Sequence, residues 1–278
     1  MSKPSFPDAN SRKRCWAARD SYFECLTAKN DDETKCQEFK EAFEANCSKA
    51  WVPDVVYYIP NFISEEEEKY LLSQVYAAPK PKWKQLSHRR LQNWGGLPHP
   101  KGMIAEGLPK WLELYTQKVA SLGVFEDHVP NHVLVNEYQP GQGIMPHEDG
   151  PLFYPTVTTI SLGSHTFLDF YHRRNESREH NGVSYRDASS GSDPPPDMEP
   201  FMSLLLEPRS LLVLQGSMYT SHLHGITERA TDSITDRVAN LSATRHGMGE
   251  ELTRTCRVSL TIRFVPRTLK MKLLFGKR

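Results

Sequence analysis

His147, Glu148 and Asp149 form a short run in which a histidine and an aspartate are two residues apart. Residues i and i+2 of an extended segment face the same side, so His147 and Asp149 can reach one ion while Glu148 points away. A second histidine, His224, stands far downstream, directly before a Gly-Ile pair. Two imidazoles and one carboxylate bind Fe(II) on one face and leave its other coordination positions open. These three residues are therefore a candidate metal site.

His222 is a competing ligand, because it lies two residues before His224 and shares its strand face. Residue type alone does not choose between the two. His165 and His172 lie near the neighbouring predicted strand. We expect both to be structural or exposed.

The segment from Arg257 to Arg263 predicts a strand with four polar residues on one face, namely Arg257, Ser259, Thr261 and Arg263. Burying two unpaired arginines costs several kcal/mol, so an anion is expected beside them. A small dicarboxylate fits, since the guanidinium fork pairs with carboxylates through two hydrogen bonds. Asn136 and Tyr138 share a face of another strand and could bind the same acid. The alternative is an exposed strand with solvated arginines.

These motifs together resemble the AlkB family of dioxygenases, and most closely its subgroup known as AlkB homologue six, over most of residues 52–278. The resemblance implies that Fe(II) is bound by His147, Asp149 and His224, because the family places its second histidine directly before Gly-Ile. It implies that 2-oxoglutarate is held by Asn136, Tyr138, Arg257, Ser259, Thr261 and Arg263. The family commonly has Asn where this chain has Ser259, so that contact is expected to be lost or bridged by water.

The reaction that the resemblance implies consumes O2 and 2-oxoglutarate and releases succinate. A substrate C–H bond is hydroxylated, commonly on an N-methyl group, and the hydroxylated carbon leaves as formaldehyde. The oxidation belongs to iron and the cosubstrate, whereas the protein supplies geometry and excludes water.

Cations and indoles alternate between residues 80 and 94, just before the predicted catalytic strands. Cations would meet phosphates and an aromatic ring could stack on an unpaired base, which predicts contact with single-stranded nucleic acid. The candidate substrate-binding residues are Lys82, Trp83, Lys84, Arg89, Arg90 and Trp94. In AlkB-like relatives this region forms a nucleotide-recognition lid, and an unpaired or flipped base enters the pocket. A solvated loop with structural tryptophans is the alternative.

Four of the five cysteines lie in the first fifty residues. Nine residues separate Cys15 from Cys25 and ten separate Cys36 from Cys47, so each pair falls near one helical face, about three turns apart. Antiparallel packing of the two helices sets Cys15 opposite Cys47 and Cys25 opposite Cys36. Two such disulfides would stabilise a unit too short to bury an adequate core. Four unrelated thiols and a zinc site are alternatives, and the long spacing argues against zinc.

Residues of about 8–51 resemble the twin Cys-x9-Cys (CHCH-like) family, and within it the cytochrome c oxidase assembly factors that combine a Cys-x9-Cys with a Cys-x10-Cys. That resemblance implies oxidation in the mitochondrial intermembrane space. The AlkB-like segment implies cytoplasm and nucleus instead. We expect cytoplasm and nucleus, because the larger domain has to reach nucleic acid and no presequence is visible.

The pattern of helices and short strands expected around these residues predicts a mainly β fold. This fold is a double-stranded β-helix, or jelly roll, with buttressing helices, preceded by a small disulfide-stapled α-hairpin. The expected domains are 1–51 and 52–278. Helices are expected from Ser64 and over 109–122, and strands over 133–138, 156–162, 166–171, 203–206, 210–214, 219–224 and 258–265. Residues 173–200 and 227–251 read as long surface loops.

The net charge and the hydropathy of the sequence limit the classes of binding partner and function that fit this chain. The 34 basic and 34 acidic residues cancel, so any affinity for nucleic acid must come from a local patch. No apolar run approaches the ~18 residues of a membrane span. Three functions remain: a dioxygenase acting on a nucleic acid base, the same chemistry on a protein side chain, and a mitochondrial cytochrome c oxidase assembly factor whose dioxygenase fold only binds.

Overall fold

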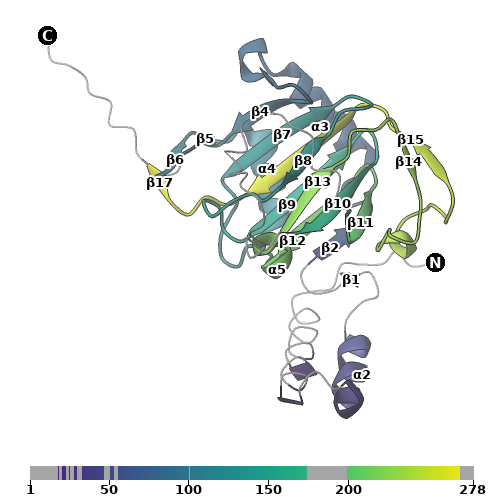
Figure 1. Ribbon diagram of the computed structural model, residues 1–278. Coiled ribbons are helices and arrows are strands. Elements are labelled where there is room, and N and C mark those ends of the chain that lie inside the picture. The colour runs from purple at the N-terminus through teal and green to yellow at the C-terminus, as the bar shows by residue number, and fades with distance from the viewer. Residues whose placement is uncertain are drawn as a thin grey trace, which may run out of the picture. The chain divides into compact units, whose positions relative to one another are not determined.

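The computed structural model describes residues 18, 21–22, 25, 28–29, 33–46, 51–52, 56–99, 101–173 and 199–269 (Figure 1). The chain divides into two units, Met1–Pro53 and Asp54–Arg278. None of the helices in these residues is long and apolar enough to span a membrane.

The first unit contains a helical turn, η1 (Glu33–Cys36), the helix α2 (Gln37–Asn46) and the short strand β1 (Trp51–Val52). Before them, Tyr22 and Cys25 have helical backbone. A disulfide joins Cys25 to Cys36, with 5.9 Å between their Cα atoms. One of the two predicted disulfides is thereby confirmed, and the predicted Cys15–Cys47 pair lies outside the described residues.

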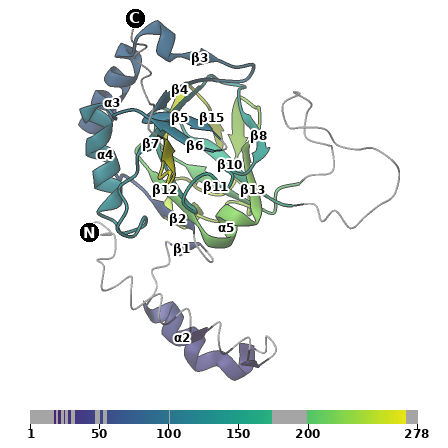
Figure 2. The ribbon, with the colours of Figure 1, turned by 90° about the vertical axis from the view of Figure 1, so that its left-hand side faces the viewer.

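Two antiparallel sheets form the centre of the second unit (Figures 1 and 2). In the larger sheet the strands of this unit follow the order β2 (Val56–Ile59), β12 (Leu211–Gln215), β9 (Thr156–Leu162), β16 (Arg257–Arg263), β7 (His132–Tyr138), β4 (Arg90–Trp94) and β3 (Lys84–Gln85). The smaller sheet has the order β11 (Met202–Leu206), β10 (Thr166–His172), β13 (His222–Ile226) and β8 (Ile144–His147). The mainly β architecture confirms the predicted fold class.

Two helices, α3 (Glu65–Ala77) and α4 (Lys110–Ala120), cover the outer face of the larger sheet (Figure 2). The predicted start at Ser64 is confirmed, because Ser64 caps α3 and exchanges hydrogen bonds with Glu67 in a capping box. The apolar stripe of α3, with Leu71 and Val75 fully buried, faces the sheet. The two helices therefore leave the opposite, inner face of the larger sheet to line the site.

The strand expected over 219–224 begins later than predicted. Residues Gly216–Thr220 form the short helix α5, and β13 starts at His222. Gly216 has a positive φ of 52°, which ends the preceding strand. Tyr219 is buried in α5, and its hydroxyl donates to the Gly150 carbonyl over 2.9 Å.

The loop expected over 227–251 is instead folded against the smaller sheet. It contains β14 (Thr231–Ser233), paired with β15 (Glu251–Thr253), and the turn η3 (Leu241–Ala243). Ile234 and Val238 pack in a cluster with Phe167 and Leu205. Asp232 is fully buried and accepts hydrogen bonds from Arg254, so charges that look solvated in sequence are paired inside the protein.

A small sheet completes the second unit. It has the order β17 (Thr268–Leu269), β6 (Gly102–Ala105) and β5 (Gly96–His99), and the turn η2 (Lys80–Lys82) precedes β3. The sequence pattern did not predict β3 to β6, because Gly, Pro and Lys interrupt their apolar alternation.

Candidate active site

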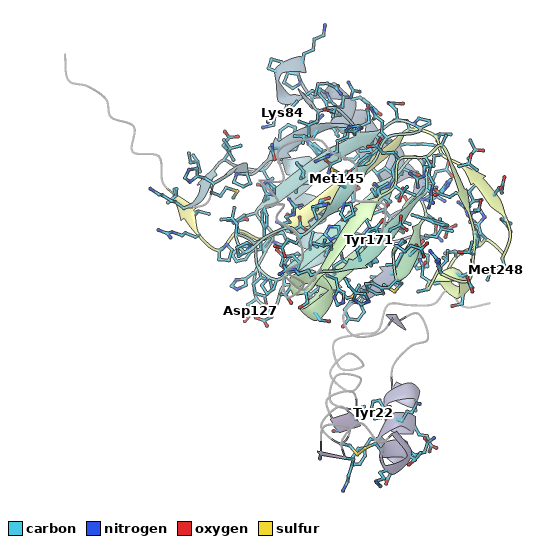
Figure 3. The ribbon with its side chains drawn as sticks, in the orientation of Figure 1. Tyr22, Lys84, Asp127, Met145, Tyr171 and Met248 are labelled. Carbon is cyan, nitrogen blue, oxygen red and sulfur yellow. A yellow bond between two sulfur atoms is a disulfide. The ribbon has the colours of Figure 1, made fainter. Side chains whose placement is uncertain are left out.

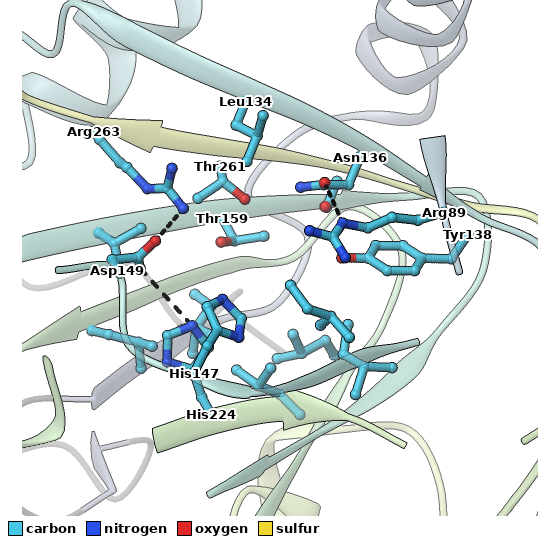
Figure 4. Close-up of a pocket in the computed structure, with 18 of the residues that line it drawn as sticks. Arg89, Leu134, Asn136, Tyr138, His147, Asp149, Thr159, His224, Thr261 and Arg263 are labelled. Atoms are coloured by element: carbon cyan, nitrogen blue, oxygen red, sulfur yellow. Dashed lines mark hydrogen bonds and ion pairs between the residues drawn. The ribbon is translucent and has the colours of Figure 1, made fainter. Parts of the chain in front are cut away.

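A cavity of about 260 Å³ lies between the inner faces of the two sheets. All nine residues proposed for the metal and the cosubstrate line it, although they come from four strands and one loop. In Figure 4 the two histidines of the smaller sheet face Asn136, Thr261 and Arg263 of the larger sheet. The strand pairing therefore brings together residues that are more than 100 positions apart in sequence.

The metal candidates meet at one end of this cavity. His147 of β8 and His224 of β13 are direct partners in the antiparallel register, and their rings lie 4.5 Å apart. Asp149 follows β8, and its Oδ2 lies 3.9 Å from Nε2 of His224. Nδ1 of His147 donates to the carbonyl oxygen of Met145 over 2.8 Å, which fixes the tautomer and leaves Nε2 free to bind a metal.

The electrostatics of the three groups suit a cation. Burial lowers the pKa of both imidazoles, that of His224 to about 3, so both are neutral at pH 7. Burial, the largest single effect, raises the pKa of Asp149, but the neighbouring groups together, led by the Arg263 cation, hold that pKa below its ordinary value. Two neutral imidazoles and one ionised carboxylate are the protonation states that metal binding requires.

The donor geometry fits an ion without forming a closed cage. In the described part of the chain, no three His, Cys, Asp or Glu side chains are arranged around a preformed metal position. Here Asp149 turns Oδ1 toward Arg263, while the buried Oδ2 has no hydrogen-bond partner. Metal bonds of about 2.1 Å to N and O allow two donor atoms nearly 4 Å apart to share one ion. The set matches the two-histidine, one-carboxylate site of non-haem Fe(II) oxygenases.

Arg257 lies at the other end of the cavity, opposite Tyr138 in the β16–β7 register. It is 4% exposed and donates to Ser161 Oγ over 3.0 Å, and its guanidinium carbon lies 5.7 Å from the centre of the Tyr138 ring. No carboxylate of the described residues forms an ion pair with Arg257. Burial lowers its pKa to about 10, so the group remains charged at neutral pH.

Arg263 has one anionic partner and unused donors. Its guanidinium binds Asp149 Oδ1 and lies 4.6 Å over the Phe153 ring, whereas its buried Nε has no partner. Ser259 and Thr261 lie between the two arginines on the same face of β16, and Ser259 is opposite Asn136. Two buried cations with polar groups between them are suited to a dicarboxylate.

His222, the competing ligand, is not part of the cavity lining. Its Nδ1 donates to the Ser217 carbonyl over 3.0 Å, and its ring lies against Phe201 and His172 at 5.2 and 5.5 Å. His165 lies 3.3 Å from Asp232, and His172 is exposed, as expected for residues outside the site.

Of the six substrate candidates, Arg89 alone lines the cavity, where its Nε donates to Asn136 Oδ1 over 3.2 Å. Arg90 instead forms two 2.7 Å hydrogen bonds to the buried Glu137 and lies 4.1 Å from the Trp83 ring. Neighbouring residues therefore point in opposite directions.

The other candidates form a cation and indole cluster or lie at the surface. Lys82 lies 4.3 Å over the Trp94 ring, and Trp94 packs edge-on against Trp111 at 5.8 Å. Lys84 is exposed (Figure 3). Trp83 and Trp94 therefore have structural partners: Arg90 and Lys82 within their own segment, and Trp111 on α4.

Glu148 and Thr159 line the cavity although the sequence reasoning did not place them there. Glu148 was expected to point away, but β8 ends at His147, so strand alternation does not apply to it. It forms an ion pair with Arg173. Thr159 is opposite Thr261 in the β9–β16 register, a relation that no local sequence signal reveals.

Comparison with known proteins agrees with this geometry. Residues 92–263 match the 2OG-Fe(II) oxygenase superfamily, and residues 4–70 match cytochrome oxidase c subunit VIb. The chain is 54% identical over 229 residues to the "Probable RNA/DNA demethylase ALKBH6" of Danio rerio, which covers 81% of this chain and 92% of that protein. It is 37% identical over 46 residues to the cytochrome c oxidase assembly factor 6 homolog of Bos taurus, over 16% of this chain and 58% of that protein.

Among solved structures, that of OsALKBH1 matches 77% of this chain and 99% of its own, with 12% identity and a TM-score of 0.47. The chain belongs to the 2OG-Fe(II) oxygenase superfamily and is a dioxygenase. Within that superfamily it is a homologue of the ALKBH6 protein, and its N-terminal module resembles cytochrome c oxidase assembly factor 6. Both predicted resemblances are confirmed.

Proposed function

We propose that the chain oxidatively demethylates a base in single-stranded or locally unpaired nucleic acid, using Fe(II), 2-oxoglutarate and O2. The observation that carries the catalytic part is the meeting of His147, Asp149 and His224 with two incompletely paired arginines in one cavity. The relative from Danio rerio, named a probable RNA/DNA demethylase, supports the substrate class.

The residues divide the work by their chemistry. His147, Asp149 and His224 hold Fe(II), while Arg257 and Arg263 pair with the carboxylates of 2-oxoglutarate. Asn136, Tyr138, Ser259 and Thr261 add hydrogen bonds to the same acid. When bound, the iron and the cosubstrate supply the oxidation by O2. The apolar lining, which includes Leu134, Leu206, Leu212, Leu214 and Ile226, excludes water from the reacting atoms.

On the substrate side, Arg89 is placed to meet the nucleotide, since it belongs to the segment before the catalytic strands and reaches the cavity. Lys82 and Lys84 add positive charge to that segment, whereas the charge of Arg90 is paired with Glu137. Trp83 and Trp94 offer ring faces for stacking, each beside the cation that already packs on it. Because the overall charge is zero, we expect weak binding that depends on few phosphate contacts.

The test uses the full-length protein with Fe(II), 2-oxoglutarate and air. Methylated single-stranded RNA and DNA oligonucleotides are compared with unmethylated ones of the same sequence, and succinate, formaldehyde and the demethylated base are measured. Methyl-dependent succinate formation with loss of the methyl group is expected, and binding should weaken as salt rises. Turnover with methylated peptides and none with any oligonucleotide would overturn the substrate class and favour a protein side chain.

A second function is favoured by a different observation. The Cys25–Cys36 disulfide and the match to cytochrome oxidase c subunit VIb suit an assembly factor in the mitochondrial intermembrane space, where disulfides persist.

For the dioxygenase function, we propose domains at 1–51 and 52–278 and place the chain in cytoplasm and nucleus, where nucleic acid is accessible. Co-fractionation of the full chain with the intermembrane space would reverse this placement.

A further inference from the structure

His132 is a buried histidine that the proposed chemistry does not use. It is the first residue of β7 and is 1% exposed. Neither ring nitrogen has a hydrogen-bond partner. Such a group loses its water without compensation, so it calls for a physical explanation.

The register of the sheet places His132 directly opposite Arg263. His132 shares the inner face of β7 with Leu134, Asn136 and Tyr138, so its ring and the Arg263 side chain are on the same side of the sheet. Both pack on one aromatic ring: the Phe153 centroid lies 5.7 Å from the His132 ring and 4.6 Å from the Arg263 guanidinium carbon. The buried Nε of Arg263 also lacks a partner. Arg263 therefore has an unused donor, and the facing residue His132 has an unused acceptor.

We propose that His132 is a positioning residue for Arg263, whose Nε–H it accepts when the guanidinium turns toward a bound dicarboxylate. Burial, aided by the Arg263 cation, lowers the pKa of His132 to about 3, so the ring is neutral and keeps a lone pair at pH 7. A neutral acceptor has a specific advantage over a carboxylate. It orients the guanidinium without competing for the charge that Asp149 and the cosubstrate share.

The backbone around the pair is held independently of the imidazole. Asn131 exchanges side-chain hydrogen bonds with the backbone of Val265, at 2.8 and 3.0 Å, and its N–H donates to the Arg263 carbonyl over 3.2 Å. Replacement of the His132 side chain should therefore leave the β7–β16 register intact.

The inference rests on the proposed cosubstrate site, and its test measures binding as well as turnover. The dissociation constant of 2-oxoglutarate is measured on the full-length protein loaded with Mn(II) under anaerobic conditions. His132→Phe, which keeps an aromatic ring but removes both nitrogens, should weaken binding about tenfold or more. His132→Gln or His132→Asn, which restore a neutral acceptor, should return at least one variant to within about threefold of wild type.

Two controls separate positioning from packing. Thr158→Val removes a buried hydroxyl that also lacks a partner, on β9, which pairs with β16, and should leave the dissociation constant unchanged. His132→Phe should not lower the melting temperature of the ligand-free protein, because it removes an unsatisfied buried group.

The possible failures are distinguishable. Wild-type affinity in His132→Phe, or equal losses in the Phe, Gln and Asn variants, would overturn the positioning role. Wild-type affinity in Arg263→Ala would instead show that the cosubstrate site itself is wrong.

Discussion

Arg257 holds a buried charge that should make the ligand-free protein less stable. Its side chain is 4% exposed, and burial lowers its pKa from an ordinary 12.5 to about 10. Since one pKa unit corresponds to about 1.36 kcal/mol, the charge costs the folded state about 3 kcal/mol. At pH 7 the group is protonated in both the folded and the unfolded chain, so the full cost is present and does not vary with pH near neutrality.

Arg257→Met should therefore stabilise the ligand-free protein and abolish cosubstrate binding. The substitution removes the charge, keeps most of the volume, and loses a hydrogen bond to Ser161 worth about 1 kcal/mol. The net gain of about 2 kcal/mol should raise the melting temperature by about 4–8 °C. Calorimetry with and without 2-oxoglutarate and Mn(II) measures both effects: the wild type should gain stability from the ligand and the variant should gain none.

Arg254→Met is the matched control, because Arg254 is equally buried but fully paired. Its guanidinium binds both carboxylate oxygens of Asp232 at 2.6 and 2.7 Å. Breaking this buried pair should destabilise the protein by about 3–5 kcal/mol without changing its 2-oxoglutarate affinity. A lower melting temperature in Arg257→Met, or normal 2-oxoglutarate binding by it, would refute the reasoning.

Three further outcomes are expected. His222→Ala should retain most succinate formation and His224→Ala none, and the reverse order would exchange their assignments. The His132 pKa is about 3 in the folded state and 6.5 ordinarily, so the unfolded chain binds the extra proton and stability is lost as pH falls below 6.5. In urea unfolding between pH 7 and pH 5, the free energy of unfolding should fall by about 2 kcal/mol more in the wild type than in His132→Phe, and equal decreases in both proteins would contradict this. If the chain resides in cytoplasm and nucleus, Cys25 and Cys36 should react in cells with an alkylating mass tag before reduction, whereas tagging only after a reductant would indicate an oxidising compartment.

The alternating face of β16 could be read from sequence because it breaks the usual pattern of a buried strand. Polar residues at every second position, with arginine at both ends, are unfavourable unless they line a site. The same reasoning placed Asn136 and Tyr138 on one face of another strand. In the structure these two residues and the four polar residues of β16 line one cavity. Strand faces follow from local periodicity, which a sequence contains.

Pairing between distant segments could not be read in this way. Asp232 in the polar stretch 227–251 and Arg254 just beyond it look like solvated charges, yet they form a buried pair, and the stretch packs against the smaller sheet. Likewise, Arg89 and Arg90 are adjacent and chemically alike, but their partners Asn136 and Glu137 on β7 send one into the cavity and the other away from it. Strand register decides such contacts, and composition does not encode register.

The most direct test of the proposed metal site is succinate formation by the full-length protein, measured together with bound iron. Wild type should bind one equivalent of Fe(II) and form succinate only when Fe(II), 2-oxoglutarate and O2 are all present. His147→Ala and Asp149→Ala should lose both the bound iron and the succinate while keeping the wild-type circular dichroism spectrum, because the strands do not depend on these side chains. Normal iron content and normal succinate formation in Asp149→Ala would contradict the assignment.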